Sequence, residues 1–151
     1  MAEIMERGKI RNRNIASQIR DFTGLKFVNV TPTDIDGFIE FNNCIYILIE
    51  TKYQIDDIPE GQERALVNLI DTIFESSKKG LLIIAIHNNP SEEDILFHKC
   101  IVSRYRSRKN WYKPKKRQTV KDIINLYLKK NCIDCPLIKC SANIYVKSLK
   151  R

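Results

Sequence analysis

Hydrophobic residues recur along this chain at two spacings, and the spacings predict strands that alternate with helices. Apolar residues at every third or fourth position indicate an amphipathic helix, whereas short alternating or continuous apolar runs indicate strands. The predicted helices span residues 15–22, 59–77 and 119–130, and the predicted strands span residues 26–30, 34–41, 45–51 and 81–86. The run at 81–86 is continuous, which is typical of a central strand covered on both faces. The pattern predicts an α/β fold with a central mixed β-sheet flanked by helices.

Charged residues interrupt the two adjacent strand patterns that precede Lys52. A strand over residues 34–41 places Asp34 and Asp36 on one face of the sheet. In the next strand, Glu50 and Lys52 share a face. Pairing of these two strands as a hairpin would bring the acids together beside the lysine. The sequence therefore predicts a site in which two carboxylates and one ammonium group lie close together.

Two neighbouring carboxylates predict a divalent cation, because like charges about 4 Å apart repel by roughly 4 kcal/mol at an effective dielectric near 20. Mg²⁺ and Mn²⁺ prefer such oxygen ligands and often complete their shell with substrate phosphate oxygens. The predicted metal ligands are Asp36 and Glu50, with Asp34 as a reserve ligand. An attacking water beside the Lys52 ammonium would then hydrolyse a phosphodiester.

These charged residues resemble the signature of the PD-(D/E)XK nuclease superfamily, which is an acid on one strand and an acid-x-lysine triplet on the next. Asp36 and the triplet Glu50-Thr51-Lys52 match this signature, although three residues separate Pro32 from Asp36 and the literal Pro-Asp pair is absent. The resemblance implies a restriction-endonuclease-like core and a Mg²⁺-dependent deoxyribonuclease. Asp36, Glu50 and Lys52 would be its catalytic residues.

Further motifs extend the resemblance over residues 12–87, about half of the chain. Gln62, with Gly before it and Ala-Leu after it at 65–66, looks like the catalytic glutamine motif of the superfamily. The runs R-D-F-T-G-L, P-T-D-I-D-G and E-T-K-Y resemble small phage and prophage members, which implies a virus-encoded protein inside a host cell. Asn14 or Gln18 stands where many members have an acid on the first helix. The choice between one metal and two stays open.

Each of these residues also has a purely structural explanation. Glu50 and Lys52 could form a salt bridge at a strand end. Asp34 and Asp36 could cap a turn, because Asp is a common turn residue. Gln62 could be a solvated residue in the first turn of its helix.

Basic residues are concentrated between residues 99 and 117, where the sequence contains no acid. Aromatic residues are interleaved with them, an arrangement that suits a groove in which cations hold phosphates and rings stack on bases. The alternative is a solvated basic loop. The predicted nucleic-acid-binding residues are Arg104, Arg106, Arg108, Lys109, Trp111, Lys113, Lys115, Lys116 and Arg117.

Length, charge and hydropathy set expectations about partners and location. The chain has 151 residues and a formal net charge of +8, which favours a single domain over residues 1–151 and a polyanionic partner. The sequence contains no apolar run of about eighteen residues, and its polar N-terminus lacks the apolar core of a signal peptide. We therefore expect a cytoplasmic protein without a membrane partner.

The chain has five cysteines, and three of them form a compact group in a C-terminal helical extension. The resemblance to the superfamily implies that Cys132, Cys135 and Cys140, with Cys44 or Cys100 as a fourth ligand, could hold an iron–sulfur cluster, and zinc would need similar thiolates. Reduced, partly buried thiols are the favoured alternative, because an intracellular protein rarely forms disulfides.

Together, these observations predict an enzyme that cuts DNA with Mg²⁺ or Mn²⁺, as an endonuclease or junction resolvase rather than as an exonuclease. A homodimer would present two sites to a duplex or a junction. One alternative is a DNA-binding protein that keeps the nuclease fold without the chemistry. RNA as substrate and an acidic protein partner for the basic segment also stay open.

Overall fold

The computed structural model describes residues 21–131. The chain divides into two compact units, Met1–Asp34 and Ile35–Arg151. In the first unit, the strand predicted at 26–30 is not formed. Phe27 and Val30 instead exchange backbone hydrogen bonds of 2.9 Å and close a tight turn, in which Val28 has a φ of 57°. The helix predicted at 15–22 lies mostly outside the described residues.

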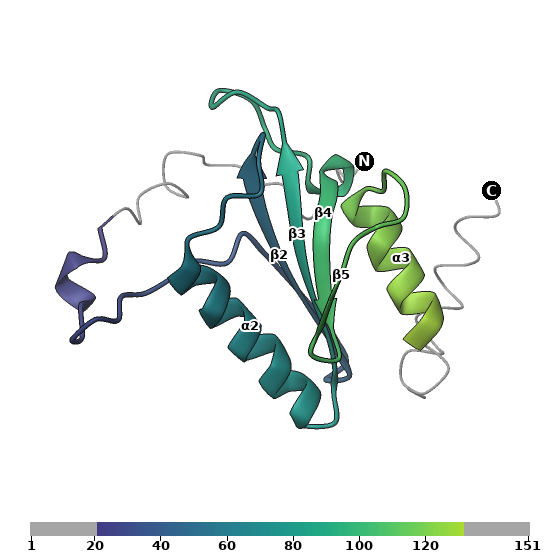
Figure 1. The fold of residues 1–151 in the computed structure, drawn as a ribbon, viewed down its shortest axis with the longest axis horizontal. Helices are drawn as coiled ribbons and strands as arrows, with labels where there is room; N and C mark the ends of the chain where they lie inside the picture. Colours follow the sequence, from purple (N-terminus) through teal and green to yellow (C-terminus); the bar gives the residue numbers. More distant parts are fainter. Residues whose placement is uncertain (1–20, 132–151) are drawn as a thin grey trace, which may run out of the picture. The chain divides into compact units, whose positions relative to one another are not determined.

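The second unit is built on a five-stranded sheet with the order β1-β2-β3-β4-β5 (Figure 1). The strands are β1 (Gly37–Phe41), β2 (Ile45–Tyr53), β3 (Lys79–His87), β4 (Ile101–Ser107) and β5 (Asn110–Tyr112). Strands β2 and β3 are parallel, and every other neighbouring pair is antiparallel. Helix α2 (Glu60–Glu75) connects the two parallel strands, and α3 (Val120–Asn131) follows β5. The predicted α/β fold with a mixed sheet flanked by helices is therefore confirmed.

The two helices cover opposite faces of the sheet, because each strand presents alternate residues to each face. On the α2 side the buried residues are Leu48, Leu66, Ile70, Leu82 and Ile84. On the α3 side they include Ile45, Ile47, Ile49, Leu81, Ile83, Val102, Val120 and Ile123. Strand β3 contributes to both cores, which confirms the prediction of a doubly covered central strand at 81–86.

Gly37 begins β1, and its lack of a side chain allows a close packing contact. A Cβ at this position would lie 2.8 Å from the ring of Phe97, which packs against the α3-side core. We expect Gly37→Ala to lower the free energy of unfolding by about 1–2 kcal/mol, because the ring must shift to make room. The measurement is urea unfolding at neutral pH.

Gly61→Ala is the matched control for this substitution. A Cβ at Gly61 meets no atom within 4 Å, and the residue lies in helix α2. Alanine should therefore leave stability unchanged or raise it by up to about 1 kcal/mol through its better helix propensity. Equal losses in the two variants would contradict the steric explanation.

Candidate active site

Strand β2 and the first turns of helix α2 bring together three of the predicted site residues. Glu50 and Lys52 are two positions apart on β2, so their side chains leave the α2 side of the sheet. Gln62 lies at the beginning of α2, which follows β2 along the chain. The site therefore lies at the carboxyl end of β2, on the face that α2 covers.

Glu50, Lys52 and Gln62 form a closed triangle of polar contacts. The Lys52 ammonium lies 2.7 Å from Oε1 of Glu50, and the Gln62 amide donates to the same oxygen at 2.9 Å. Lys52 also donates to Oε1 of Gln62 at 3.1 Å. Each side chain is thus held by the other two, which fixes the direction of the carboxylate and of the ammonium.

Burial differs sharply across this triangle. Glu50 is 2% exposed, whereas the side chain of Lys52 is 24% exposed. A buried ion pair contributes little net stability, because desolvation of both charges offsets their attraction. The triangle instead keeps the Lys52 ammonium accessible to solvent beside a buried, fixed acid. The arrangement can present an oriented ammonium to a phosphate oxygen or to a water.

Asp36 lies in the bend that precedes β1, and its carboxylate is hydrogen-bonded to Thr51, the residue between Glu50 and Lys52. Its Oδ2 accepts hydrogen bonds of 2.8 Å from both the backbone N–H and the hydroxyl of Thr51. Thr51 and Glu50 are adjacent on β2, so their side chains leave opposite faces of the sheet. The contacts of Asp36 are therefore separate from those of the Glu50 triangle.

The ladder between β1 and β2 ends one residue short of Asp36 and Glu50. Gly37 pairs with Ile49 in the antiparallel ladder, so the next position along each strand would set Asp36 opposite Glu50. Oδ1 of Asp36 has no hydrogen bond within residues 21–131, and the residue is exposed. Asp34, the reserve ligand, is the last residue of the first unit, whereas the other four candidates belong to the second.

The basic strand β4 is neutralised by acids from another part of the chain. Arg104 binds Asp56 at 2.8 Å and Glu63 at 2.8 Å. Arg106 binds Asp71 through two nitrogens, at 2.9 and 2.7 Å. The hydrogen bonds from Arg104 lower the pKa of Glu63 and, although burial opposes the change, also that of Asp56.

Two further members of the predicted nucleic-acid interface make internal contacts. Lys109 pairs with Glu75 at the end of α2. Trp111 packs against the α2-side core, and the guanidinium of Arg104 lies 4.4 Å from the centre of a Trp111 ring. Arg104, Arg106, Lys109 and Trp111 thus join β4, β5 and α2, and a phosphate at any of these three cations would have to compete with an acid.

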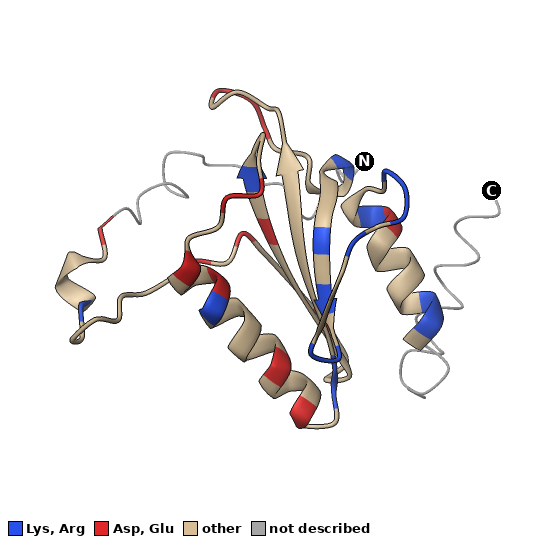
Figure 2. Cartoon of the chain, in the orientation of Figure 1, with Lys and Arg blue, Asp and Glu red and all other residues tan. Residues whose placement is uncertain are grey.

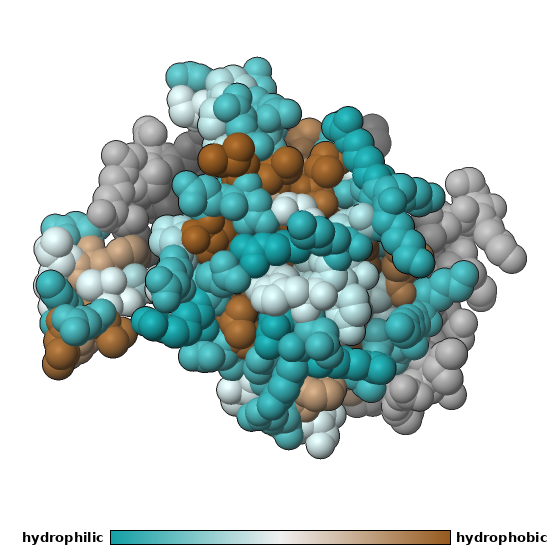
Figure 3. Space-filling view, in the orientation of Figure 1, coloured by the Kyte–Doolittle hydropathy of each residue, from teal (hydrophilic) through white to brown (hydrophobic). Residues whose placement is uncertain are grey.

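The remaining predicted contacts are exposed to solvent. Arg108 is in the hairpin turn between β4 and β5, and residues 113–117 belong to the connection from β5 to α3, which is blue in Figure 2. The surface over this connection is hydrophilic in Figure 3. These residues form no ion pair within residues 21–131: Arg108, Lys113, Lys115, Lys116 and Arg117. The charge available to a polyanion is therefore in the turn and in this connection.

The cysteines differ from the sequence-based expectation in one respect. Cys44, just before β2, is disulfide-bonded rather than reduced. Cys100 is a buried free thiol, and burial raises its pKa. The predicted zinc or iron–sulfur ligands Cys132, Cys135 and Cys140 lie outside the described residues. Within residues 21–131, no cluster of three or more His, Cys, Asp or Glu side chains could hold a metal.

The helices of the described residues and the comparisons with known proteins were searched for further signs of function. Among the helices within residues 21–131, none is both long and apolar enough to cross a membrane. No family model, characterised protein or solved structure was found to match this chain.

Proposed function

We propose that this chain is a metal-dependent nuclease of the PD-(D/E)XK type that hydrolyses phosphodiester bonds in DNA. The observation that carries the proposal is the triangle of Glu50, Lys52 and Gln62 at the carboxyl end of β2. The acid-x-lysine triplet and the following glutamine motif, which resemble the superfamily in sequence, contribute all three members. The α/β fold supports the same proposal, because it presents the triplet at the end of a central strand.

The donor groups at this site fit Mg²⁺ or Mn²⁺, because both cations prefer carboxylate oxygens. Glu50 and Asp36 would hold the ion once the Asp36 side chain turned from Thr51 toward Glu50, since their neighbours Gly37 and Ile49 pair in the ladder. Such a cation, when bound, polarises a phosphoryl group and makes a bound water more acidic. The partly exposed Lys52 ammonium would orient the attacking water or offset negative charge on the phosphate. Gln62 would keep Glu50 and Lys52 in place.

The exposed cations of the turn and of residues 113–117 support a nucleic-acid partner. Exposed lysine and arginine side chains attract phosphates without regard to base sequence. We propose DNA as the substrate, with RNA as the second choice, inside a cell and with an endonuclease or junction-resolving action. A homodimer would allow a domain of this size to place two sites on one duplex.

One observation favours the alternative of a DNA-binding protein without catalysis. Asp36 is bound by Thr51 through one carboxylate oxygen, and its contacts are separate from those of Glu50. An enzyme must bring both carboxylates to one cation, whereas a binding protein has no such requirement.

The deciding experiment is a cleavage panel of linear, circular, single-stranded and four-way-junction DNA with Mg²⁺, Mn²⁺ or EDTA. We expect cutting with either metal and none with EDTA. Asp36→Asn should reduce the rate by at least about 100-fold, because it removes one carboxylate from the metal site. Asp57→Asn is the matched control, since Asp57 is exposed and is not among the proposed site residues. Tight DNA binding without cutting would favour the non-catalytic alternative.

A further inference from the structure

A pocket of about 200 Å³ lies between the β4–β5 hairpin and helix α3. Its walls include Tyr105 and Tyr112 from the hairpin and Tyr127 from the helix. Tyr105 packs against the α3-side core, so the pocket lies on the face of the sheet opposite to Glu50. It is therefore a site distinct from the proposed active site.

The aromatic walls of this pocket are held in fixed positions. Tyr105 and Tyr112 are partners in the β4–β5 ladder, and their rings stack with centroids 5.4 Å apart and an angle of 21° between the planes. The Tyr127 hydroxyl donates to the carbonyl of Gly80 at 3.0 Å and accepts from Ser107 at 3.4 Å. Tyr112 remains 42% exposed, so one ring is open to a ligand. The pocket thus offers a preformed stacking surface.

The pocket is also positively charged. Arg108 and Lys130 line it, and no acid within residues 21–131 does. Neither cation forms an ion pair within residues 21–131. Their state contrasts with that of Arg106 and Lys109 in the same hairpin, which acids of α2 neutralise. Two cations without an ion pair in the described part of the chain, beside exposed aromatic surface, suit a ligand that combines a phosphate with a planar ring.

We propose that this pocket binds one unpaired nucleotide of a single-stranded nucleic acid. The base would stack on Tyr112, and Arg108 and Lys130 would hold the adjacent phosphate. At about 200 Å³ the pocket is smaller than the roughly 300–1,000 Å³ of sites that enclose a whole small ligand, so it would take the base and leave the sugar and phosphate at its edge. The exposed cations of residues 113–117 follow β5 directly and would bind the neighbouring phosphates of the same strand.

Fluorescence anisotropy with the full chain in EDTA tests this proposal. The probes are labelled single-stranded DNA and RNA of about twelve nucleotides and a DNA duplex of the same length. We expect both single strands to bind more tightly than the duplex. The tighter of the two single strands identifies DNA or RNA as the preferred ligand. Tyr112→Ala should weaken single-strand binding by about 5-fold or more, because stacking on one aromatic ring contributes about 1–3 kcal/mol per base.

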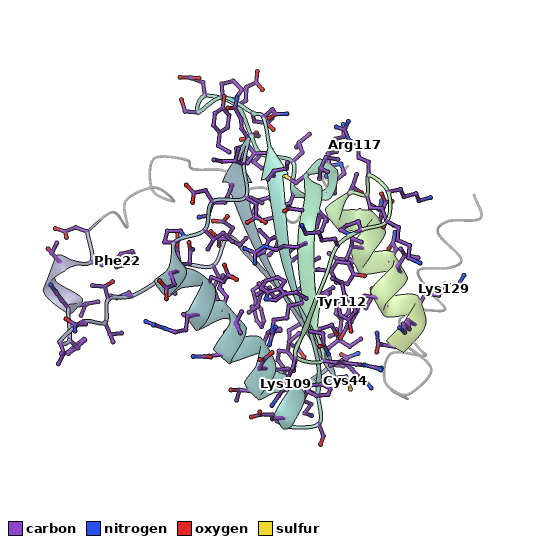
Figure 4. The ribbon with its side chains drawn as sticks, in the orientation of Figure 1. Phe22, Cys44, Lys109, Tyr112, Arg117 and Lys129 are labelled. Atoms are coloured by element: carbon purple, nitrogen blue, oxygen red, sulfur yellow. The ribbon has the colours of Figure 1, made fainter. Side chains whose placement is uncertain are left out.

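Lys130→Gln and Lys129→Gln are a matched pair on the last turn of α3. Lys130 lines the pocket, whereas Lys129 projects on the side of the helix turned away from Tyr112 in Figure 4. Lys130→Gln should weaken binding about 5-fold and Lys129→Gln less than 2-fold, since of these two lysines only Lys130 adjoins the bound phosphate. Far-UV circular dichroism checks that the variants fold.

Equal losses in the two lysine variants, or unchanged binding in Tyr112→Ala, would overturn the proposal, because binding would then be electrostatic without a pocket. Competition by inorganic phosphate that matches competition by a mononucleotide would also overturn it. The assay contains no metal, so its result is independent of the proposed cleavage. Pocket-dependent binding in a protein that never cuts DNA would reject the nuclease and keep the nucleotide site.

Discussion

Lys52→Met is expected to abolish metal-dependent cleavage and to lower the free energy of unfolding by about 2 kcal/mol. The loss of cleavage, by at least about 1,000-fold, follows if the ammonium offsets charge in the transition state. The loss of stability follows because Glu50 is 2% exposed and would lose the ammonium of Lys52, which lies 2.7 Å from its Oε1. Cleavage of the preferred DNA substrate and urea unfolding of the same preparation measure the two effects.

The double variant Glu50→Leu with Lys52→Met separates the two effects. Replacement of a whole buried ion pair by apolar residues is often neutral or stabilising, because it removes the desolvation cost of both charges. We therefore expect the double variant to recover the lost stability and to remain unable to cut DNA. Recovery of stability without activity would mean that the pair is kept for chemistry. Full cleavage by Lys52→Met would show instead that the pair is only a salt bridge of the fold.

The strands and helices of the second unit could be predicted from local patterning because the core has two faces. The continuous apolar run at 81–86 is central, and Leu66 and Ile70 of the predicted helix at 59–77 are buried against it. These elements needed only the periodicity of apolar residues. The strand predicted at 26–30 was wrong, because a run of five residues with three apolar positions fits a strand and a tight turn equally well.

Side-chain partners were harder to predict than elements. The sequence between residues 99 and 117 contains no acid, yet Arg104 and Arg106 are neutralised by Glu63 and Asp71, more than thirty residues earlier. The prediction treated the segment as isolated, whereas helix α2 brings the acids back over β4. The acids at positions 63, 71 and 75 of the predicted helix were the signal that could have revealed these pairs.

The candidate site shows the same division between backbone and side chains. Strand alternation predicted the shared face of Glu50 and Lys52, and the triangle has that geometry. The predicted hairpin would also bring Asp36 to Glu50, but the ladder ends at the pair of Gly37 and Ile49, and Asp36 lies outside it. The carboxylate itself is bound by Thr51, whose hydroxyl and N–H compete for it. No periodicity argument includes such competition, because it depends on rotation about a single side-chain bond.

Arg104→Met is expected to lower the free energy of unfolding by about 3 kcal/mol at neutral pH. The guanidinium binds Asp56 and Glu63 and lies 4.4 Å from the centre of a Trp111 ring. Its removal leaves two carboxylates near each other in a partly buried position, which is more costly than the loss of an exposed pair. Arg117→Met is the control, since Arg117 is exposed, and its effect should stay within about 0.5 kcal/mol.

The stability loss caused by Arg104→Met should become smaller at acid pH, where Asp56 and Glu63 are protonated. The folded wild type holds the pKa values of Asp56 and Glu63 below their ordinary values, so these acids stabilise it above the unfolded pKa values of about 4. That contribution is lost as the pH falls through the folded pKa values. Urea unfolding at pH 7, 5 and 3 measures the difference in the free energy of unfolding between wild type and variant. This difference should become smaller only in acid. The same difference at all three pH values would mean that Arg104 stabilises the fold through its contact with the Trp111 ring rather than through the two acids.

The same two variants should rank in the opposite order for DNA affinity: Arg117→Met should lose more affinity than Arg104→Met. Arg104 is occupied by two acids, so Arg104→Met should change affinity for DNA by less than about 2-fold while the protein is folded. Arg117 forms no ion pair within residues 21–131, and its loss should weaken binding and reduce the salt dependence by about one phosphate contact. A strong loss of affinity in Arg104→Met alone would mean that DNA displaces Asp56 and Glu63, which would restore β4 to the nucleic-acid interface.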